Sequence, residues 1–93
     1  MGVSFKITYH ELVVREDIPA LNGAWRTRVK KAIDEKLTVA PEVFGKPLRK
    51  SLAGYRKLRV ADWRVIFRIE GKVVKIFVIA YRSRVYEQIY GRI

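Results

Sequence analysis

Residues 55–81 read YRKLRVADWRVIFRIEGKVVKIFVIAY, and this stretch decides the fold. Three runs within it are rich in β-branched and aromatic residues, a pattern typical of β-strands: about 55–60, 63–70 and 73–81. The connections Ala61-Asp62 and Gly71-Lys72 are so short that they predict an antiparallel meander, although a primed turn suits Gly71 better than Ala61. The last run is apolar on both faces, which predicts a central or doubly covered strand.

Two-residue loops also predict which residues of the meander lie opposite one another. The predicted pairs are Val60 with Trp63, Arg59 with Arg64, Leu58 with Val65, Lys57 with Ile66, Tyr55 with Arg68, Arg68 with Lys75, and Arg64 with Ile79. One sheet face then carries the cations Lys57, Arg59, Arg64, Arg68 and Lys75 and the apolar residues Ile66, Phe77, Ile79 and Tyr81. Like charges across a ladder repel, so this face should attract an anion unless the side chains spread into water or Asp62 and Glu70 offset them.

The segment before the meander predicts one further strand and two helices. Val3, Phe5, Ile7 and Tyr9 alternate with polar residues, as in a half-buried strand. Residues 11–21 predict a short helix, with Pro19 at a turn or at a new helix start. A second helix, with Asn22 as its N-cap, carries one apolar stripe and ends near Leu37: Trp25, Val29, Ala32, Ile33 and Leu37.

These elements predict a single α+β domain over residues 1–93. Residues 39–54 contain Pro41, Gly45 and Pro47 and read as mostly loop with one helical turn. The order is therefore strand, two helices and three strands. We expect a small, mainly antiparallel four-stranded sheet with two helices packed on one face.

The composition is that of a globular chain. Hydrophobic residues make up 49% of the 93 residues, which suffices for one core. The absence of cysteine excludes disulfides, thiolate metal sites and cysteine nucleophiles. No signal-peptide pattern and no apolar run of roughly 18 residues occurs, so we expect a cytoplasmic protein that does not enter the membrane.

Positive charge is the strongest compositional signal. Twenty Lys and Arg residues stand against nine Asp and Glu residues, for a formal net charge of +11. Such an excess attracts polyanions over long distances and favours a nucleic-acid partner. Simple solubility and a membrane surface are the alternative readings, but no long amphipathic basic helix stands out.

The titratable residues exclude several kinds of catalysis. His10 is the one histidine, and the acidic residues are scattered, so neither a catalytic triad nor a two-metal site can be assembled. No phosphate-binding glycine motif occurs either. What remains is a cationic site without metal or cofactor. Such a site can cut RNA, because the 2′-hydroxyl of RNA can itself attack the adjacent phosphorus.

Three segments carry a resemblance to a known family: GKPL at 45–48, LAGYRKLRVADWRVIF at 52–67, and YRSRVY at 81–86. In this order they resemble the RelE/ParE toxin superfamily, and specifically its RelE-like branch. The resemblance implies the toxin of a type II toxin–antitoxin pair. RelE-like members cleave messenger RNA in the A site of the 70S ribosome, whereas ParE-like members poison DNA gyrase and lack the nuclease residues.

The resemblance also implies roles for individual residues. Four match the catalytic positions of the family: Arg64, Tyr86, Lys57 and Arg82. Six more are expected to bind RNA: Arg59, Arg56, Tyr55, Arg68, Lys50 and Lys46. Because Tyr55 stands where some relatives have lysine, the identity of the general base stays open.

The implied partners are a cognate antitoxin, messenger RNA on the ribosome and, only through the toxin–antitoxin complex, operator DNA. Two other functions remain as alternatives. One is a ParE-like inhibitor of gyrase, and the other is a basic RNA-binding module without catalysis.

Overall fold

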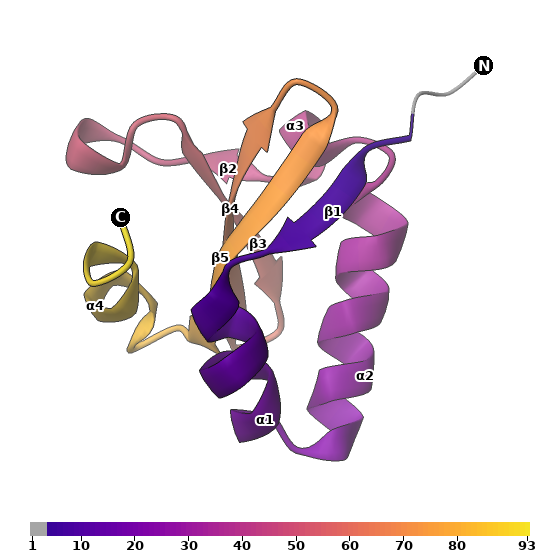
Figure 1. Ribbon diagram of the computed structural model, residues 1–93, viewed down its shortest axis with the longest axis vertical. Helices are drawn as coiled ribbons and strands as arrows, with labels where there is room; N and C mark the ends of the chain where they lie inside the picture. The colour runs from indigo at the N-terminus through magenta and orange to yellow at the C-terminus, as the bar shows by residue number, and fades with distance from the viewer. Residues whose placement is uncertain (1–3) are drawn as a thin grey trace.

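The predicted meander forms the middle of the sheet, with the strand bounds expected from the sequence. It consists of β3 (Tyr55–Val60), β4 (Trp63–Glu70) and β5 (Val73–Tyr81). These strands come from a computed structural model that describes residues 4–93 (Figure 1). Val3, expected at the start of the first strand, lies outside the described residues.

Two outer strands complete a sheet of order β1-β5-β4-β3-β2. β1 (Lys6–Tyr9) runs parallel to β5, and β2 (Lys46–Pro47) runs antiparallel to β3. β5 thus lies between β1 and β4, which confirms the central position predicted from its apolar faces. β2 lies within the segment that was predicted to be mostly loop. The sequence did not predict this strand, because two residues are too few to show a hydrophobic periodicity.

Both hairpin loops have a positive φ at their first residue. The value is 54° at Ala61 and 63° at Gly71. Glycine adopts this conformation freely, whereas the Cβ of Ala61 makes it costly. The register of the first hairpin is nevertheless the predicted one, from Val60 opposite Trp63 to Tyr55 opposite Arg68.

The second hairpin contains a β-bulge that the sequence reading missed. Arg68 pairs with Lys75 as predicted, but the register shifts between Ile66 and Phe67 because β5 carries one extra residue there. Arg64 consequently lies opposite Ala80, so the predicted pairing of Arg64 with Ile79 is wrong. From Val78 onward, each side chain of β5 therefore lies on the face of the sheet opposite to the predicted one.

The reversal also corrects the predicted position of two apolar residues. Ile79 is buried in the cluster beneath the N-terminal helices, and Tyr81 pairs with Trp63, whose side chain packs on that same cluster. Neither residue therefore lies on the cationic face. Phe77 does lie there, packed with Ile66 as expected.

The N-terminal helices cover one face of the sheet. Residues 11–20 form a continuous helical segment that includes the π-helical η1 (Val13–Asp17) and α1 (Ile18–Ala20). α2 (Gly23–Ala32) continues into a π-helical turn, η2 (Ile33–Leu37). The predicted N-cap is confirmed, because Asn22 Oδ1 accepts a hydrogen bond from the Trp25 N–H at 3.0 Å.

We call this side of the sheet the helical face. Its core holds the predicted stripe of α2 and η2 together with the inward residues of the strands, including Val29, Ile33, Leu37, Leu58, Val65, Phe67 and Ile79. Twelve buried residues form this cluster, so most of the apolar burial of the protein lies here.

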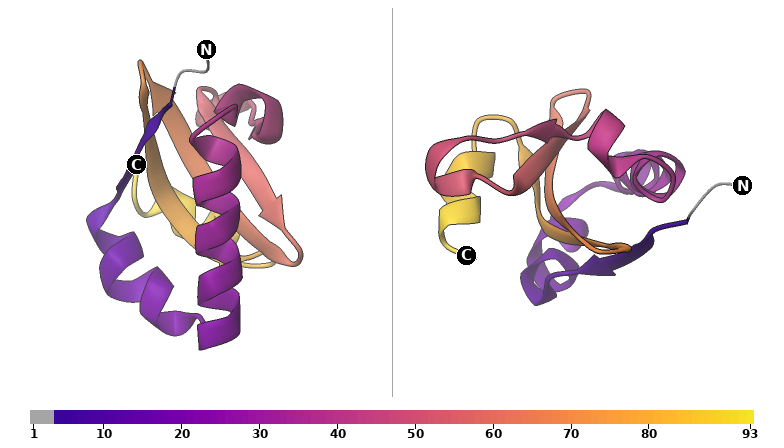
Figure 2. Two further views of the ribbon diagram at one scale, coloured as in Figure 1. Left: turned by 90° about the vertical axis from the view of Figure 1, so that its right-hand side faces the viewer. Right: turned by 90° about the horizontal axis from the view of Figure 1, so that it is seen from above.

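The opposite side of the sheet, which we call the cationic face, is covered by α4 (Val85–Tyr90). Figure 2 shows α4 across the sheet from α2. Its core is smaller and consists of Leu52, Ile66, Phe77, Val78, Ala80, Val85 and Ile89. The connection from η2 to β3 adds α3 (Pro41–Phe44) and η3 (Lys50–Leu52).

The fold class predicted from the sequence is confirmed: an α+β protein with a mainly antiparallel sheet. β2 and α4 are additions to the predicted order. No helix in the described part of the chain is long and apolar enough to cross a membrane.

Candidate functional site

The cationic face brings basic side chains together in pairs across the strands. Three pairs of directly opposed residues are both positive: Lys46 with Lys57, Arg59 with Arg64, and Arg68 with Lys75. Directly opposed like charges destabilise a sheet by about 0.2–1 kcal/mol per pair. Three such pairs on one face are therefore a structural cost, and an anionic ligand would relieve it.

Few acidic groups offset this charge. Arg68 Nε lies 3.6 Å from Glu70 Oε2, and Arg82 Nε lies 3.9 Å from Asp62 Oδ1. Within residues 4–93, none of Lys46, Lys57, Arg59, Arg64 and Lys75 has an acidic partner. Of the five cations predicted on this face, only Arg68 thus lies close to a turn carboxylate, that of Glu70.

Two arginines converge on one carbonyl oxygen at the end of the first hairpin. Arg64 Nη1 donates to the Ala61 oxygen at 2.7 Å and to the Trp63 oxygen at 3.0 Å. Arg59 Nε donates to the same Ala61 oxygen at 3.4 Å. Ala61 thus has a left-handed backbone conformation, and its carbonyl oxygen accepts hydrogen bonds from both guanidinium groups. A site that gathers forked donors in this way suits a phosphate group.

α4 places a tyrosine hydroxyl against the lysine of β3. Lys57 Nζ donates to the Tyr86 hydroxyl oxygen at 2.8 Å, and it lies 5.4 Å from the centre of the Tyr86 ring. Tyr86 as a whole residue remains 41% exposed. This contact joins two residues that are far apart in the sequence, and only the family resemblance had linked them.

The other predicted site residues are distributed around this centre. Tyr55 lies on the cationic face with its ring edge-on to Phe77, at a centroid distance of 5.2 Å, and below the guanidinium of Arg68. Lys50 lies in η3 with φ 56°, in the loop beside α4. Arg82 lies just beyond β5, where its N–H donates to the Asp62 carbonyl at 2.9 Å.

Arg56 alone points away from the cationic face. Its Nη1 donates to the backbone oxygens of Glu42 at 3.2 Å and Gly45 at 2.9 Å. Arg56 therefore ties β3 to α3, whereas the family resemblance predicts that it binds RNA. The alternation along β3 contained this signal, because Arg56 has the opposite parity to Lys57 and Arg59.

His10 makes a structural contact. Its Nδ1 accepts the Leu12 N–H at 3.0 Å, which satisfies a donor at the start of the first helical segment. No group of three or more His, Cys, Asp or Glu side chains in the described part of the chain is arranged to hold a metal ion.

The resolved pKa shifts lie away from the cationic face. Burial raises the pKa of the Tyr9 hydroxyl above its ordinary value, partly opposed by the charge of Lys30. A hydrogen bond from Lys30 to Asp34 raises the pKa of Lys30.

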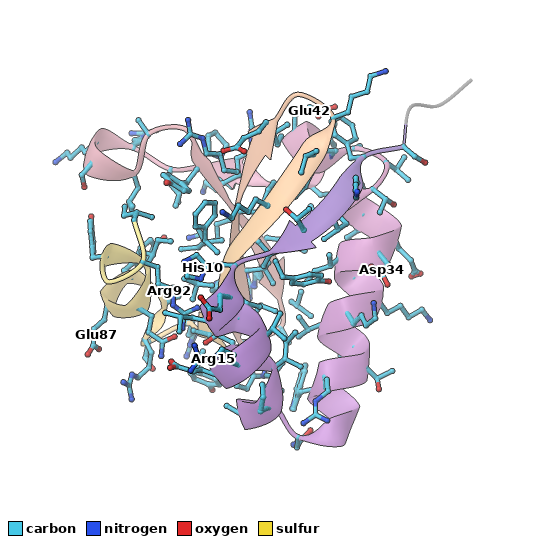
Figure 3. The ribbon with its side chains drawn as sticks, in the orientation of Figure 1. His10, Arg15, Asp34, Glu42, Glu87 and Arg92 are labelled. Atoms are coloured by element: carbon cyan, nitrogen blue, oxygen red, sulfur yellow. The ribbon has the colours of Figure 1, made fainter. Side chains whose placement is uncertain are left out.

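Sequence reasoning missed the ion pair between Asp17 and Arg92. Arg92 forms a buried ion pair with Asp17, and Figure 3 shows Arg92 between α4 and the first helical segment. No local pattern signals such a pair, because the two partners are 75 positions apart. The helix itself had a weak signal in the spacing of Val85 and Ile89.

Comparison with protein families decides the identity. The family model described as ParE toxin of type II toxin-antitoxin system, parDE, matches residues 12–86. The chain belongs to the RelE/ParE toxin superfamily. It is thus a toxin of the type II toxin–antitoxin class. Comparison with curated protein sequences gives no match.

Solved structures of toxins share the fold of this toxin. One chain of the RelBE2 toxin–antitoxin complex from Mycobacterium tuberculosis is 26% identical, with a TM-score of 0.80 over 87% of this toxin and 94% of that chain. A mutant of the E. coli toxin RelE in the free state is 17% identical, with a TM-score of 0.67 over 97% and 98%. The RelB–RelE complex of Methanococcus jannaschii gives 19% identity and a TM-score of 0.64 over 86% and 95%.

Proposed function

We propose that this toxin is a ribosome-dependent endoribonuclease that cuts messenger RNA without a metal. The supporting observation is the contact of Lys57 with the Tyr86 hydroxyl at 2.8 Å, on the sheet face that also carries Arg59 and Arg64. RNA is the substrate class because its 2′-hydroxyl supplies the nucleophile that the protein does not.

The arginines would stabilise the charge that develops on the phosphate. In the free toxin, Arg59 and Arg64 donate to the Ala61 carbonyl, a neutral acceptor. The two non-bridging oxygens of a phosphodiester share one negative charge and are stronger acceptors, so the guanidinium groups would turn from the carbonyl to the phosphate. Donors that are already gathered lose little entropy when the charge forms.

Tyr86 would transfer a proton, and Lys57 would support it electrostatically. Attack by the 2′-hydroxyl releases one proton, and departure of the 5′-oxygen requires one. The Tyr86 hydroxyl would donate the proton that the departing 5′-oxygen takes up, while Lys57 compensates the negative charge left on the tyrosine oxygen. The proton of the 2′-hydroxyl would pass to water, because the general base is not assigned to a side chain. This assigns Tyr86 to proton transfer and Lys57 to electrostatic support.

The RNA path would follow the remaining cations of the face. Lys46, Arg68 and Lys75 flank the centre along the strands, and Lys50 and Arg82 lie in neighbouring loops. Tyr55 offers a half-buried ring beside Arg68 for contact with a base. Arg56, which is tied to α3, is left out of this path.

The proposed partners are a cognate antitoxin and the ribosome, which would make the toxin cytoplasmic. Two solved relatives are described as toxin–antitoxin complexes. An acidic amphipathic segment of the antitoxin would suit the cationic face and would mask the site by charge. Operator DNA would be bound only through the toxin–antitoxin complex.

Primer-extension mapping of messenger RNA after induction tests the proposal. The wild type should cut within translated codons, and Arg64→Ala or Tyr86→Phe should lower cleavage by about 10²–10³-fold while folding is retained. Arg15→Ala is a matched control, because Arg15 is an exposed cation paired with Glu11 on the helical segment. Unchanged cleavage in both site variants would refute the assignment.

Gyrase inhibition is the second candidate function, favoured by the ParE description of the matching family. It predicts DNA-damage signalling with intact messenger RNA after induction, and toxicity that survives both site variants. An RNA-binding module without catalysis is the third: it would bind RNA with a steep salt dependence and produce no cleavage.

A further inference from the structure

We infer that the Asp17–Arg92 ion pair is a clamp that holds α4 on the sheet and so positions Tyr86 against Lys57. Arg92 would therefore be a positioning residue for the proposed site, although it does not touch the site itself. The functional part of this inference rests on the proposed nuclease, whereas the structural part stands alone.

The pair is bidentate and buried. Arg92 Nη1 lies 2.6 Å from Asp17 Oδ2, and Arg92 Nη2 lies 2.8 Å from Asp17 Oδ1. The side chains of Arg92 and Asp17 are 6% and 5% exposed. Counted over backbone and side chain together, Asp17 is the one charged or polar residue of the described part of the chain that is buried, and the other ion pairs there join exposed side chains, apart from the contact of Arg92 with Glu16. Loss of Arg92 would leave the buried Asp17 carboxylate without its cation, whereas loss of Asp17 would leave Arg92 with the exposed Glu16, whose Oε1 lies 3.9 Å from Arg92 Nη2.

The pair also completes the sheet where β1 ends. The last hydrogen bond of this segment to β5 runs from the His10 N–H to the Ile76 oxygen at 2.7 Å. Beyond it, Arg92 Nη1 donates to the Phe77 oxygen at 3.0 Å, and Asp17 Oδ2 accepts the Ile79 N–H at 2.8 Å. The side chains of Arg92 and Asp17 thus form hydrogen bonds with the Phe77 carbonyl and the Ile79 N–H, next to the bulge in β5. A longer β1 would have paired with these backbone groups.

α4 depends on such contacts. A helix of six residues is too short to persist on its own, so its position comes from docking. Val85 and Ile89 bury one side of it, and the Arg92 N–H donates to the Ile89 oxygen at 2.9 Å. The clamp therefore acts directly on the last turn of α4, while the hydroxyl of Tyr90 reaches Ser51 Oγ at 2.9 Å.

Tyr86 takes its position from the helix. Its side chain is 41% exposed, and its contact with Lys57 is made through the hydroxyl and the ring face. A displacement of α4 by a few ångströms would break this contact and leave Lys57, Arg59 and Arg64 on the strands unchanged. The clamp would thus control one component of the site and not the others.

The structural arm of the test uses NMR and amide exchange on the free toxin. Arg92→Gln and Asp17→Asn should accelerate exchange of α4 amides about tenfold relative to α2 and weaken the cross-peak between the Lys57 and Tyr86 side chains. Arg92→Lys keeps the charge but loses the fork and should be intermediate. Ile33→Val is the matched control: it destabilises the helical face and should leave the cross-peak intact. Wild-type protection of α4 in both clamp variants would overturn the inference.

The functional arm measures cleavage of messenger RNA on ribosomes. Clamp variants should lower kcat about tenfold and keep KM for the ribosome within about twofold, because the cations that bind RNA are unmoved. An equal loss in Ile33→Val would overturn a positioning role and leave only stability. If the wild type does not cleave, the proposed nuclease fails, and the NMR arm still decides whether the clamp holds α4.

Discussion

The two faces of the sheet are built on different principles. The helical face is closed by the first helical segment, α2 and η2 over twelve buried apolar residues of the described chain, and burial is the main source of its stability. The cationic face is closed by a helix of six residues over seven buried residues and carries three opposed pairs of cations. The difference indicates that apolar burial on the helical face stabilises the protein enough to offset the repulsion between like charges on the cationic face.

The largest expected effect is on the helical face. Ile33 is 1% exposed in the centre of its cluster, so Ile33→Ala should lower the free energy of unfolding by about 2–5 kcal/mol. Ile33→Val, which removes one methylene, should cost only about 0.5–1.5 kcal/mol. Urea unfolding measures both. If Ile33→Ala lowered the free energy of unfolding by less than about 1 kcal/mol, the helical face would not be the main source of stability.

A smaller effect is expected where α3 meets β2. A Cβ on Gly45 would overlap the ring of Phe67 and lie 2.8 Å from the Pro41 oxygen, so Gly45→Ala should cost about 1–3 kcal/mol. Gly23→Ala is the matched control, because nothing lies within 4 Å of the added methyl group. Alanine in the first turn of α2 should be neutral or slightly stabilising. The thermal unfolding midpoint should fall in Gly45→Ala and should stay the same or rise slightly in Gly23→Ala.

Removing a cation from the cationic face should stabilise the protein. Lys46→Gln relieves the repulsion with Lys57 and should raise the free energy of unfolding by about 0.2–1 kcal/mol at low salt. Added salt should reduce the gain, because it screens exposed charges. Lys72→Gln, in the turn between β4 and β5, lowers the net charge equally but removes no opposed pair. An equal gain in this control would assign the effect to net charge.

The smallest expected effect is a loss of stability at alkaline pH from the helical face. Burial raises the pKa of Tyr9 from its ordinary value of 10.0, so the unfolded chain loses this proton first as the pH rises. The contribution of Tyr9 to stability should be constant below about pH 10 and should fall as the pH rises through the raised native pKa. Tyr9→Phe should remove part of this slope, measured by urea unfolding across the alkaline range. Lys30, whose pKa is also raised, contributes in the same direction.

The meander and the cationic face were predictable because local rules determine them. Hairpin loops of two residues fix the register, and alternation along β3 then assigns Lys57 and Arg59 to one face. The same rules failed after the bulge, where one extra residue in β5 moved Ile79 and Tyr81 to the other face. The side chains of Asp17 and Arg92 bind the backbone of Ile79 and Phe77 beside the bulge, and no local pattern signals tertiary contacts of this kind.

The contact between Lys57 and Tyr86 was not predictable from periodicity. It requires α4 to fold back over the sheet, and its short helix has only Val85 and Ile89 as an apolar signal. Family resemblance linked the two residues, and the geometry then brought them to 2.8 Å. Long-range pairs of this kind lie beyond local sequence rules.

The parallel pairing of β1 with β5 has a consequence for how the toxin is made. Lys6 lies opposite Val73, so the first strand cannot find its partner until the last strand has been synthesised. Closing such a long loop delays sheet formation, and parallel pairing is slow in any case. During synthesis at about 5–20 residues per second, the nascent chain would therefore spend seconds without its central sheet. Translation order itself thus postpones the moment at which a new copy becomes competent to act.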